Sequence, residues 1–98
     1  MEIVYKTRKI QRVCEDASTA TRAHGERMAL LIHQRVDELR AAMSVEMLVQ
    51  FRIGGCHPLT GNRASQYGMN LVHPYRLVFE KVSTNTLEVR ILEIVDYH

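Results

Sequence analysis

The segment Leu87–His98 reads Leu-Glu-Val-Arg-Ile-Leu-Glu-Ile-Val-Asp-Tyr-His. Before its last three residues it is rich in Val, Ile and Leu, which favour the pleated surface of a β-strand. Two apolar pairs, Ile91-Leu92 and Ile94-Val95, interrupt strict alternation, as expected for a strand that is covered on both faces. This segment therefore predicts the central strand of a sheet, against which the other elements pack.

The segment ends in Asp96, Tyr97 and His98, three side chains that can hold or transfer a proton. The ends of a chain are usually frayed and solvated, and a lone terminal His would favour that interpretation. Here a carboxylate and a phenol accompany the imidazole, and a rigid strand precedes them. We therefore interpret the end of this segment as a candidate site.

The residues before this segment predict further strands. Residues 66–71 and 75–80 alternate between apolar side chains and others, with the period of a strand. His73-Pro74 predicts the turn between them, because Pro cannot donate to a strand ladder. Residues 83–86 have the composition of a second turn. Tyr67 and Tyr75 are interpreted as core residues rather than stacking platforms, and the whole half predicts an antiparallel sheet.

The amino-terminal half predicts a short strand at residues 3–5 and then helices. Thr7 can cap the first helix, and Gly25 is the kind of residue at which helices end. The clearest helix is predicted over residues 26–43, and Ser44 caps a brief turn after it. His33 is interpreted as a boundary residue of that helix. Its apolar stripe consists of Met28, Leu31, Ile32, Val36, Leu39 and Met43.

These elements predict one α+β domain over residues 1–98, in which an amino-terminal strand and a helical hairpin pack on an antiparallel sheet of about four strands. Two cysteines are too few for a disulfide framework and lack metal-ligand spacing. No apolar run approaches the roughly 20 residues that a membrane span needs, and the start does not resemble a secretory signal. We expect a cytoplasmic protein with reduced thiols and no membrane partner.

The net charge is only +2, but its distribution is uneven. Residues 51–79 contain no Asp or Glu and include five Arg and His side chains: Arg52, His57, Arg63, His73 and Arg76. If this part of the chain forms one surface, its positive potential suits phosphate groups.

Three parts of the sequence have side chains that suit chemistry on a phosphodiester. They are the loop from Cys56 to Arg63, then Arg76, and the Asp-Tyr-His end. Arg can hold phosphate oxygens in a fork and stabilise added negative charge. His57 and His98 can move protons near neutral pH, and Asp96 can orient a neighbouring base. No pair of acidic residues lies near the loop, so two-metal catalysis is not predicted.

Composition and spacing alone reach no further than a positively charged α+β domain with a His/Arg site for phosphate. The loop and His73 each have a purely structural interpretation as turns.

Three motifs in the carboxy-terminal half of the sequence resemble those of a known family. They are His57-Pro58-Leu59-Thr60-Gly61-Asn62-Arg63 with Gln66-Tyr67, then His73-Pro74-Tyr75-Arg76-Leu77-Val78-Phe79-Glu80, and finally Ile94-Val95-Asp96-Tyr97-His98. In this order they resemble the RelE/ParE superfamily of toxins, and within it the HigB-type killer proteins of plasmid maintenance systems.

The resemblance implies a RelE-like fold and a ribosome-dependent endonuclease that cuts messenger RNA in A-site codons and so inhibits translation. It implies no metal or cofactor, and a cognate HigA-like antitoxin as partner, with a homodimer or a toxin–antitoxin hetero-oligomer as the assembly. By motif, His57 and His98 are the proton-transfer residues, Arg76 contacts the scissile phosphate, and Asp96 and Tyr97 orient the substrate.

The resemblance also implies RNA or phosphate contacts outside the proton-transfer residues. Arg63 is one of them. Relatives often carry Lys where this chain has Thr60, so one electrostatic contribution is absent unless Arg63 or Arg52 replaces it. His73, in the same acid-free segment, is a further candidate for phosphate binding.

Two other functions remain open. A ParE-like toxin acts by binding DNA gyrase and needs neither His57 nor His98. An inactive relative would serve only to bind an antitoxin or RNA. The loop and the Asp-Tyr-His end favour the nuclease over both, because a protein that only binds has no need of proton-transfer groups.

Overall fold

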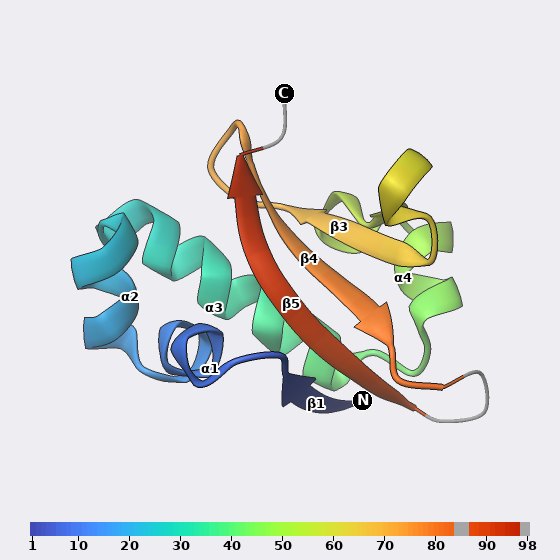
Figure 1. The fold of residues 1–98 in the computed structure, drawn as a ribbon, viewed down its shortest axis with the longest axis horizontal. Helices are drawn as coiled ribbons and strands as arrows, with labels where there is room; N and C mark the ends of the chain where they lie inside the picture. The colour runs from blue at the N-terminus through green and yellow to red at the C-terminus, as the bar shows by residue number, and fades with distance from the viewer. Residues whose placement is uncertain (84–86, 97–98) are drawn as a thin grey trace.

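The computed structural model describes residues 1–83 and 87–96 (Figure 1). In this part of the chain, a five-stranded sheet has the order β1-β5-β4-β3-β2. Its strands are β1 (Glu2–Tyr5), β2 (His57–Pro58), β3 (Gln66–Asn70), β4 (Tyr75–Lys81) and β5 (Glu88–Asp96). The helices are α1 (Arg8–Glu15), α2 (Ala17–His24), α3 (Glu26–Ala41) and α4 (Val45–Gln50). Two 3-10 turns are η1 (Ile53–Gly55) and η2 (Gly61–Arg63).

The predicted α+β fold is confirmed, and β5 is central as expected. It lies between β1 and β4 and runs through the middle of the molecule in Figure 1. The sheet is mixed rather than wholly antiparallel, because β1 pairs in parallel with β5, Glu2 opposite Glu88. The sheet has a fifth strand, β2, which the sequence did not predict. A strand of two residues is too short to show a period.

Side-chain caps define where the helices begin. The hydroxyl of Thr7 accepts a hydrogen bond from the backbone N–H of Ile10 at the start of α1, as predicted. Asp16 caps α2, which begins at Ala17, by accepting a hydrogen bond from the N–H of Ser18. Gly25 ends α2 and immediately precedes α3. Ser44 caps α4 by accepting from the N–H of Met47.

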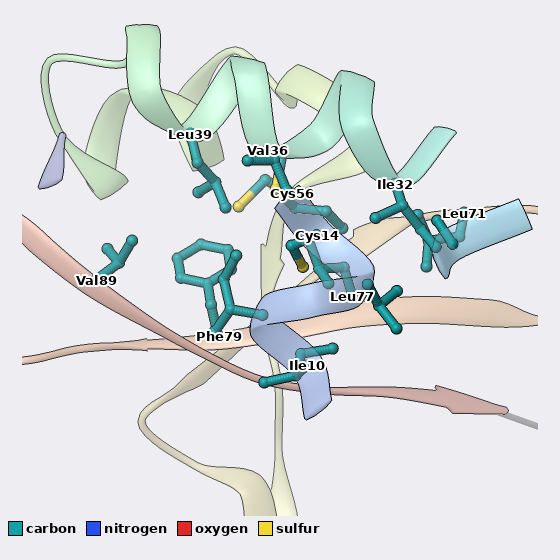
Figure 2. Close-up of a cluster of buried hydrophobic side chains, with 14 of the residues drawn as sticks. Ile10, Cys14, Ile32, Val36, Leu39, Cys56, Leu71, Leu77, Phe79 and Val89 are labelled. Carbon is teal, nitrogen blue, oxygen red and sulfur yellow. The ribbon is translucent and has the colours of Figure 1, made fainter. Parts of the chain in front are cut away.

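The main core lies between the helices and one face of the sheet. Figure 2 shows Ile32, Val36 and Leu39 of α3 directed towards Leu77 and Phe79 of β4. Tyr67 stacks on Phe79 with ring centroids 5.4 Å apart, which confirms its place beside the core. Each large apolar side chain that is fully buried in such a core contributes about 1.5–3 kcal/mol by leaving water.

Two predicted core residues lie elsewhere. Met43 is 73% exposed, because α3 ends at Ala41 and the chain turns before Met43 can continue the stripe. Tyr75 is 37% exposed, because it is the first residue of β4 and its partner in the ladder, Asp96, is the last residue of β5. His33 is half-buried, as expected of a boundary residue.

Within the described residues no helix has the length and apolarity to cross a bilayer.

A β-bulge in β5 explains the broken alternation of its sequence. Val78 pairs with Glu93 whereas Phe79 pairs with Ile91, so one strand holds an extra residue here. Ile91 and Ile94 consequently face the helices, and Leu92 packs with Val78 on the other face. This helix-free side, which we call the open face, carries a second small apolar cluster made of Leu59, Val78, Leu92 and the partly buried Val95.

Candidate active site

Strand register places the first two candidate residues on the open face. Directly opposed residues of paired strands send their side chains to the same side of a sheet. One row across the sheet therefore consists of Glu93, Val78, Gly68 and His57, and the neighbouring row consists of Val95, Arg76 and Asn70. His57 and Arg76 come from β2 and β4, so β3 separates them.

Gly68 leaves a gap between these two side chains. A β-carbon at Gly68 would lie 3.7 Å from Cε1 of His57, 3.9 Å from Cδ of Arg76 and 3.2 Å from Cδ2 of Leu59. Three side chains thus surround one point on the open face, which we call the Gly68 notch. A glycine within a strand often marks a close approach of this kind, and this was the signal in the sequence that could have identified Gly68.

The imidazole of His57 has a defined orientation. Its Nδ1 lies 2.9 Å from the carbonyl oxygen of Gly55. A carbonyl oxygen can only accept, so Nδ1 carries the hydrogen and donates it. In the neutral ring Nε2 is then the nitrogen with the free lone pair, and it can take a proton from a substrate.

The guanidinium of Arg76 lacks a full set of acceptors. Its Nη1 donates to the carbonyl of Tyr75 over a long 3.4 Å, and its Nε is buried with no hydrogen-bond partner in the described part of the chain. No carboxylate among the described residues forms an ion pair with Arg76. A buried donor without an acceptor is costly, and a bound anion would supply the missing acceptor.

Arg63 is already paired. Its Nη2 donates to Glu93 at 2.9 Å and its Nη1 donates to Gln66 at 3.0 Å. β4 and β5 bring acidic residues beside the acid-free segment, so the positive charge of Arg63 is balanced locally by Glu93. Glu80 likewise pairs with Arg90 on the same face. The sequence interpretation did not identify Glu93.

The remaining predicted residues are not joined to the notch by any described contact. Arg52 and Thr60 are exposed at the turns η1 and η2, and His73 is exposed in the turn between β3 and β4. Asp96 is opposite Tyr75 in the ladder, whereas Val95 is opposite Arg76. The side chain of Asp96 therefore leaves the sheet on the face away from Arg76. Tyr97 and His98 lie outside the described residues, and their predicted roles remain predictions.

Comparison with known proteins identifies the fold. No family model matches the chain, and no curated protein matches it. Solved structures do match. A YoeB/ParE toxin from Agrobacterium tumefaciens has a TM-score of 0.64 at 14% identity over the whole of both chains. A YoeB-YefM complex from Staphylococcus aureus has a TM-score of 0.64 at 16% identity, covering 100% of this chain and 97% of the other.

A YoeB dimer from Staphylococcus aureus has a TM-score of 0.63 at 18% identity, with coverage of 100% and 97%. Identities this low speak for the fold alone. The HigB branch suggested by the sequence motifs remains a prediction. At the level of architecture, this chain has the α+β fold of the YoeB/ParE-type toxins, as its RelE/ParE-like motifs predicted.

Proposed function

We propose that this protein is the toxin of a toxin–antitoxin pair and cuts messenger RNA on the ribosome, without a metal ion. The observation that carries the proposal is the convergence of His57 and Arg76 on the Gly68 notch, where the Nε of Arg76 has no acceptor among the described residues. A phosphodiester fits both groups, since the phosphate accepts from the guanidinium and the ribose supplies a proton to the imidazole.

In the proposed reaction the ribose 2′-oxygen attacks phosphorus while a base removes its proton. Arg76 stabilises the negative charge that accumulates on the phosphoryl oxygens. The bond to the 5′-oxygen breaks as an acid protonates that oxygen, which leaves a 2′,3′-cyclic phosphate and a 5′-hydroxyl. His57 and His98 share the two proton transfers, and the orientation of His57 equips its Nε2 to take part. Asp96 and Tyr97 are proposed to orient the substrate.

The proposal includes a neutralising partner. Two of the matched structures are described as YoeB-YefM complexes and one as a YoeB dimer. We propose that this chain is likewise held inactive by an antitoxin, HigA-like if the HigB resemblance holds, and forms a homodimer or hetero-oligomer. Its place of action would be the cytoplasm, where ribosomes translate.

The proposal is tested by adding the purified protein to ribosomes that translate a defined message and sequencing the new RNA 5′ ends. Cuts are expected within the A-site codon. His57→Ala and Arg76→Ala should each lower the cleavage rate about 10²- to 10⁴-fold. Arg76→Lys should not restore it, because a lysine cannot reproduce the fork of a guanidinium.

Arg90→Ala is the matched control, since Arg90 lies on the same face but pairs with Glu80. The nuclease is excluded if no A-site cuts form. If both His57→Ala and Arg76→Ala cut at the wild-type rate, the Gly68 notch is excluded as the place of cleavage. Toxicity that persists in His57→Ala cells without RNA cuts would instead favour the gyrase-binding function. A protein that is harmless when expressed without its partner would favour the inactive binding module.

A further inference from the structure

Arg63 connects the loop between β2 and β3 to the central strand β5. It is the last residue of η2, and its guanidinium donates both to Glu93 on β5 and to Gln66 at the start of β3. Because β4 lies between β3 and β5, this side chain reaches across one whole strand. We call Arg63, Glu93 and Gln66 the Arg63 clasp.

The bulge in β5 makes the clasp possible. With strict alternation Glu93 would share a face with Ile91, which points into the core beneath the helices. The extra residue instead pairs Glu93 with Val78 on the open face. Bulges commonly re-aim a side chain in this way. The clasp therefore depends on a specific irregularity of the central strand.

The loop is also fixed from below. Leu59 is buried against Val78 and Leu92, and its N–H donates to the carbonyl of Gln66 at 2.9 Å, which closes the loop over residues 59–66. The same Leu59 side chain forms one wall of the Gly68 notch. Leu59 anchors this loop in the small apolar cluster, and Arg63 anchors it to Glu93. Together they keep the Leu59 side chain in place beside His57.

We propose that Glu93 is a positioning residue, which acts through Arg63 to hold this loop as a wall of the notch. Arg63 is accordingly the anchor of the loop and not a contact to RNA phosphate. Its Nη1 already donates to Gln66 and its Nη2 to Glu93, so a phosphate that took both bonds of this fork would have to displace Glu93. This inference rests on the proposed function for its activity readout and on the geometry for its structural readout.

A charge-swap cycle tests the inference. The variants are Arg63→Ala, Glu93→Ala, and the double variant Arg63→Glu with Glu93→Arg, which restores an ion pair of opposite polarity. Each single variant should lower kcat about tenfold to a hundredfold, since small displacements at a site have effects of this size. KM for programmed ribosomes should stay unchanged, and the double variant should recover most of kcat.

Hydrogen exchange gives a readout that does not depend on activity. The amides of Leu59, Arg63 and Ala64 donate within the loop, so their exchange should accelerate in both single variants and return towards wild type in the double variant. Arg90→Ala is the matched control, because it breaks the Glu80–Arg90 pair on the same face at a residue of β5 that is opposite Glu80 and not opposite a loop residue. It should change neither kcat nor loop exchange.

Two results would overturn the inference. One is loop exchange that is unaffected by Glu93→Ala. The other is a double variant that stays as impaired as Arg63→Ala while Glu93→Ala cuts normally, which would make Arg63 a direct RNA contact. If the wild-type protein cuts no RNA at all, the proposed function fails, and the exchange measurements alone decide whether the clasp holds the loop.

Discussion

At Gly68 the absence of a side chain provides the space that His57, Arg76 and Leu59 border. Replacing its hydrogen by a methyl group would place a carbon 3.2 Å from Cδ2 of Leu59 and 3.9 Å from Cδ of Arg76, inside the notch where we propose that the phosphate binds. The backbone itself can accept alanine, because Gly68 is not in the left-handed region.

We therefore expect Gly68→Ala to separate activity from stability. The cleavage rate should fall roughly tenfold to a hundredfold, by displacement of the reacting groups. The free energy of unfolding should change by no more than about 1 kcal/mol, since alanine reduces the entropy of the unfolded chain and offsets some crowding. Single-turnover cleavage and urea unfolding measure the two quantities. A folded Ala variant that cuts at the wild-type rate would remove the notch from the mechanism.

Among the elements, α4 supports the strand that carries His57. It buries Val45 and Leu48 in the main core and is joined to β4 by the ion pair between Glu46 and Lys81. Its first turn depends on the hydroxyl of Ser44, which accepts from the N–H of Met47 at 3.1 Å. A helix of this length has little stability apart from its cap and its packing.

Ser44→Ala should lower the free energy of unfolding by about 1 kcal/mol, which corresponds to a fall in Tm of roughly 4–8 °C for a domain of this size. Ser44→Asp should keep most of the stability, because a carboxylate caps a helix as well as a hydroxyl does. Thermal unfolding followed by circular dichroism measures both variants. Equal Tm values for Ser44→Ala and the wild type would show that packing alone holds α4.

Comparison of the elements with the sequence shows which signals are local. Thr7 and Gly25 were correctly predicted at helix ends, because a cap depends only on a few neighbouring residues. Ser44 was correctly predicted as a cap, but the brief turn predicted after it is the helix α4. Met43 was wrongly placed in the core because periodicity continues in the sequence after the helix has ended. Glu93 was not predicted, because its contact with Arg63 depends on the strand order and on the bulge. Neither feature can be predicted from the residues next to Glu93 in the sequence.

The same reasoning applies to the candidate site. His57 and Arg76 were identified by residue type and loop composition, and the register then placed them on one face. Gly68 has no reactive group, and its only signal in the sequence is a glycine within a predicted strand; the contacts around it come from the structure. Asp96 shows the opposite case, since the register places this chemically plausible residue on the other side of the sheet from Arg76.

At the scale of the whole molecule, two buried thiols set an alkaline limit to stability. Burial raises the pKa of Cys14, which Glu15 raises further, and the pKa of Cys56, in each case to about 12. In the unfolded chain both thiols ionise near pH 9. The unfolded state therefore binds fewer protons than the folded state above that pH, and stability must fall as the pH rises.

The stabilisation should be fully present below about pH 8.5 and should be lost progressively between about pH 9 and 12. In this range the free energy of unfolding should fall by about 1.4 kcal/mol per pH unit for each thiol, because one pKa unit corresponds to about that free energy. Urea unfolding from pH 7 to pH 10.5 measures it. The double variant Cys14→Ala with Cys56→Ala should have a flatter profile. An identical profile would assign the alkaline limit to other groups, such as Tyr5, whose burial also raises its pKa to about 12.

The parallel pairing of β1 with β5 joins the first strand of the domain to the last one. During translation the chain emerges from its amino end, so β1 waits without a partner while the helices form. β1 has no neighbouring strand, and β4 has only β3, until residues 88–96 have been made. Contacts this distant in sequence make folding slow. Translation products that stop before Glu88 lack the strand that joins both halves of the sheet, so incomplete synthesis should yield no assembled site.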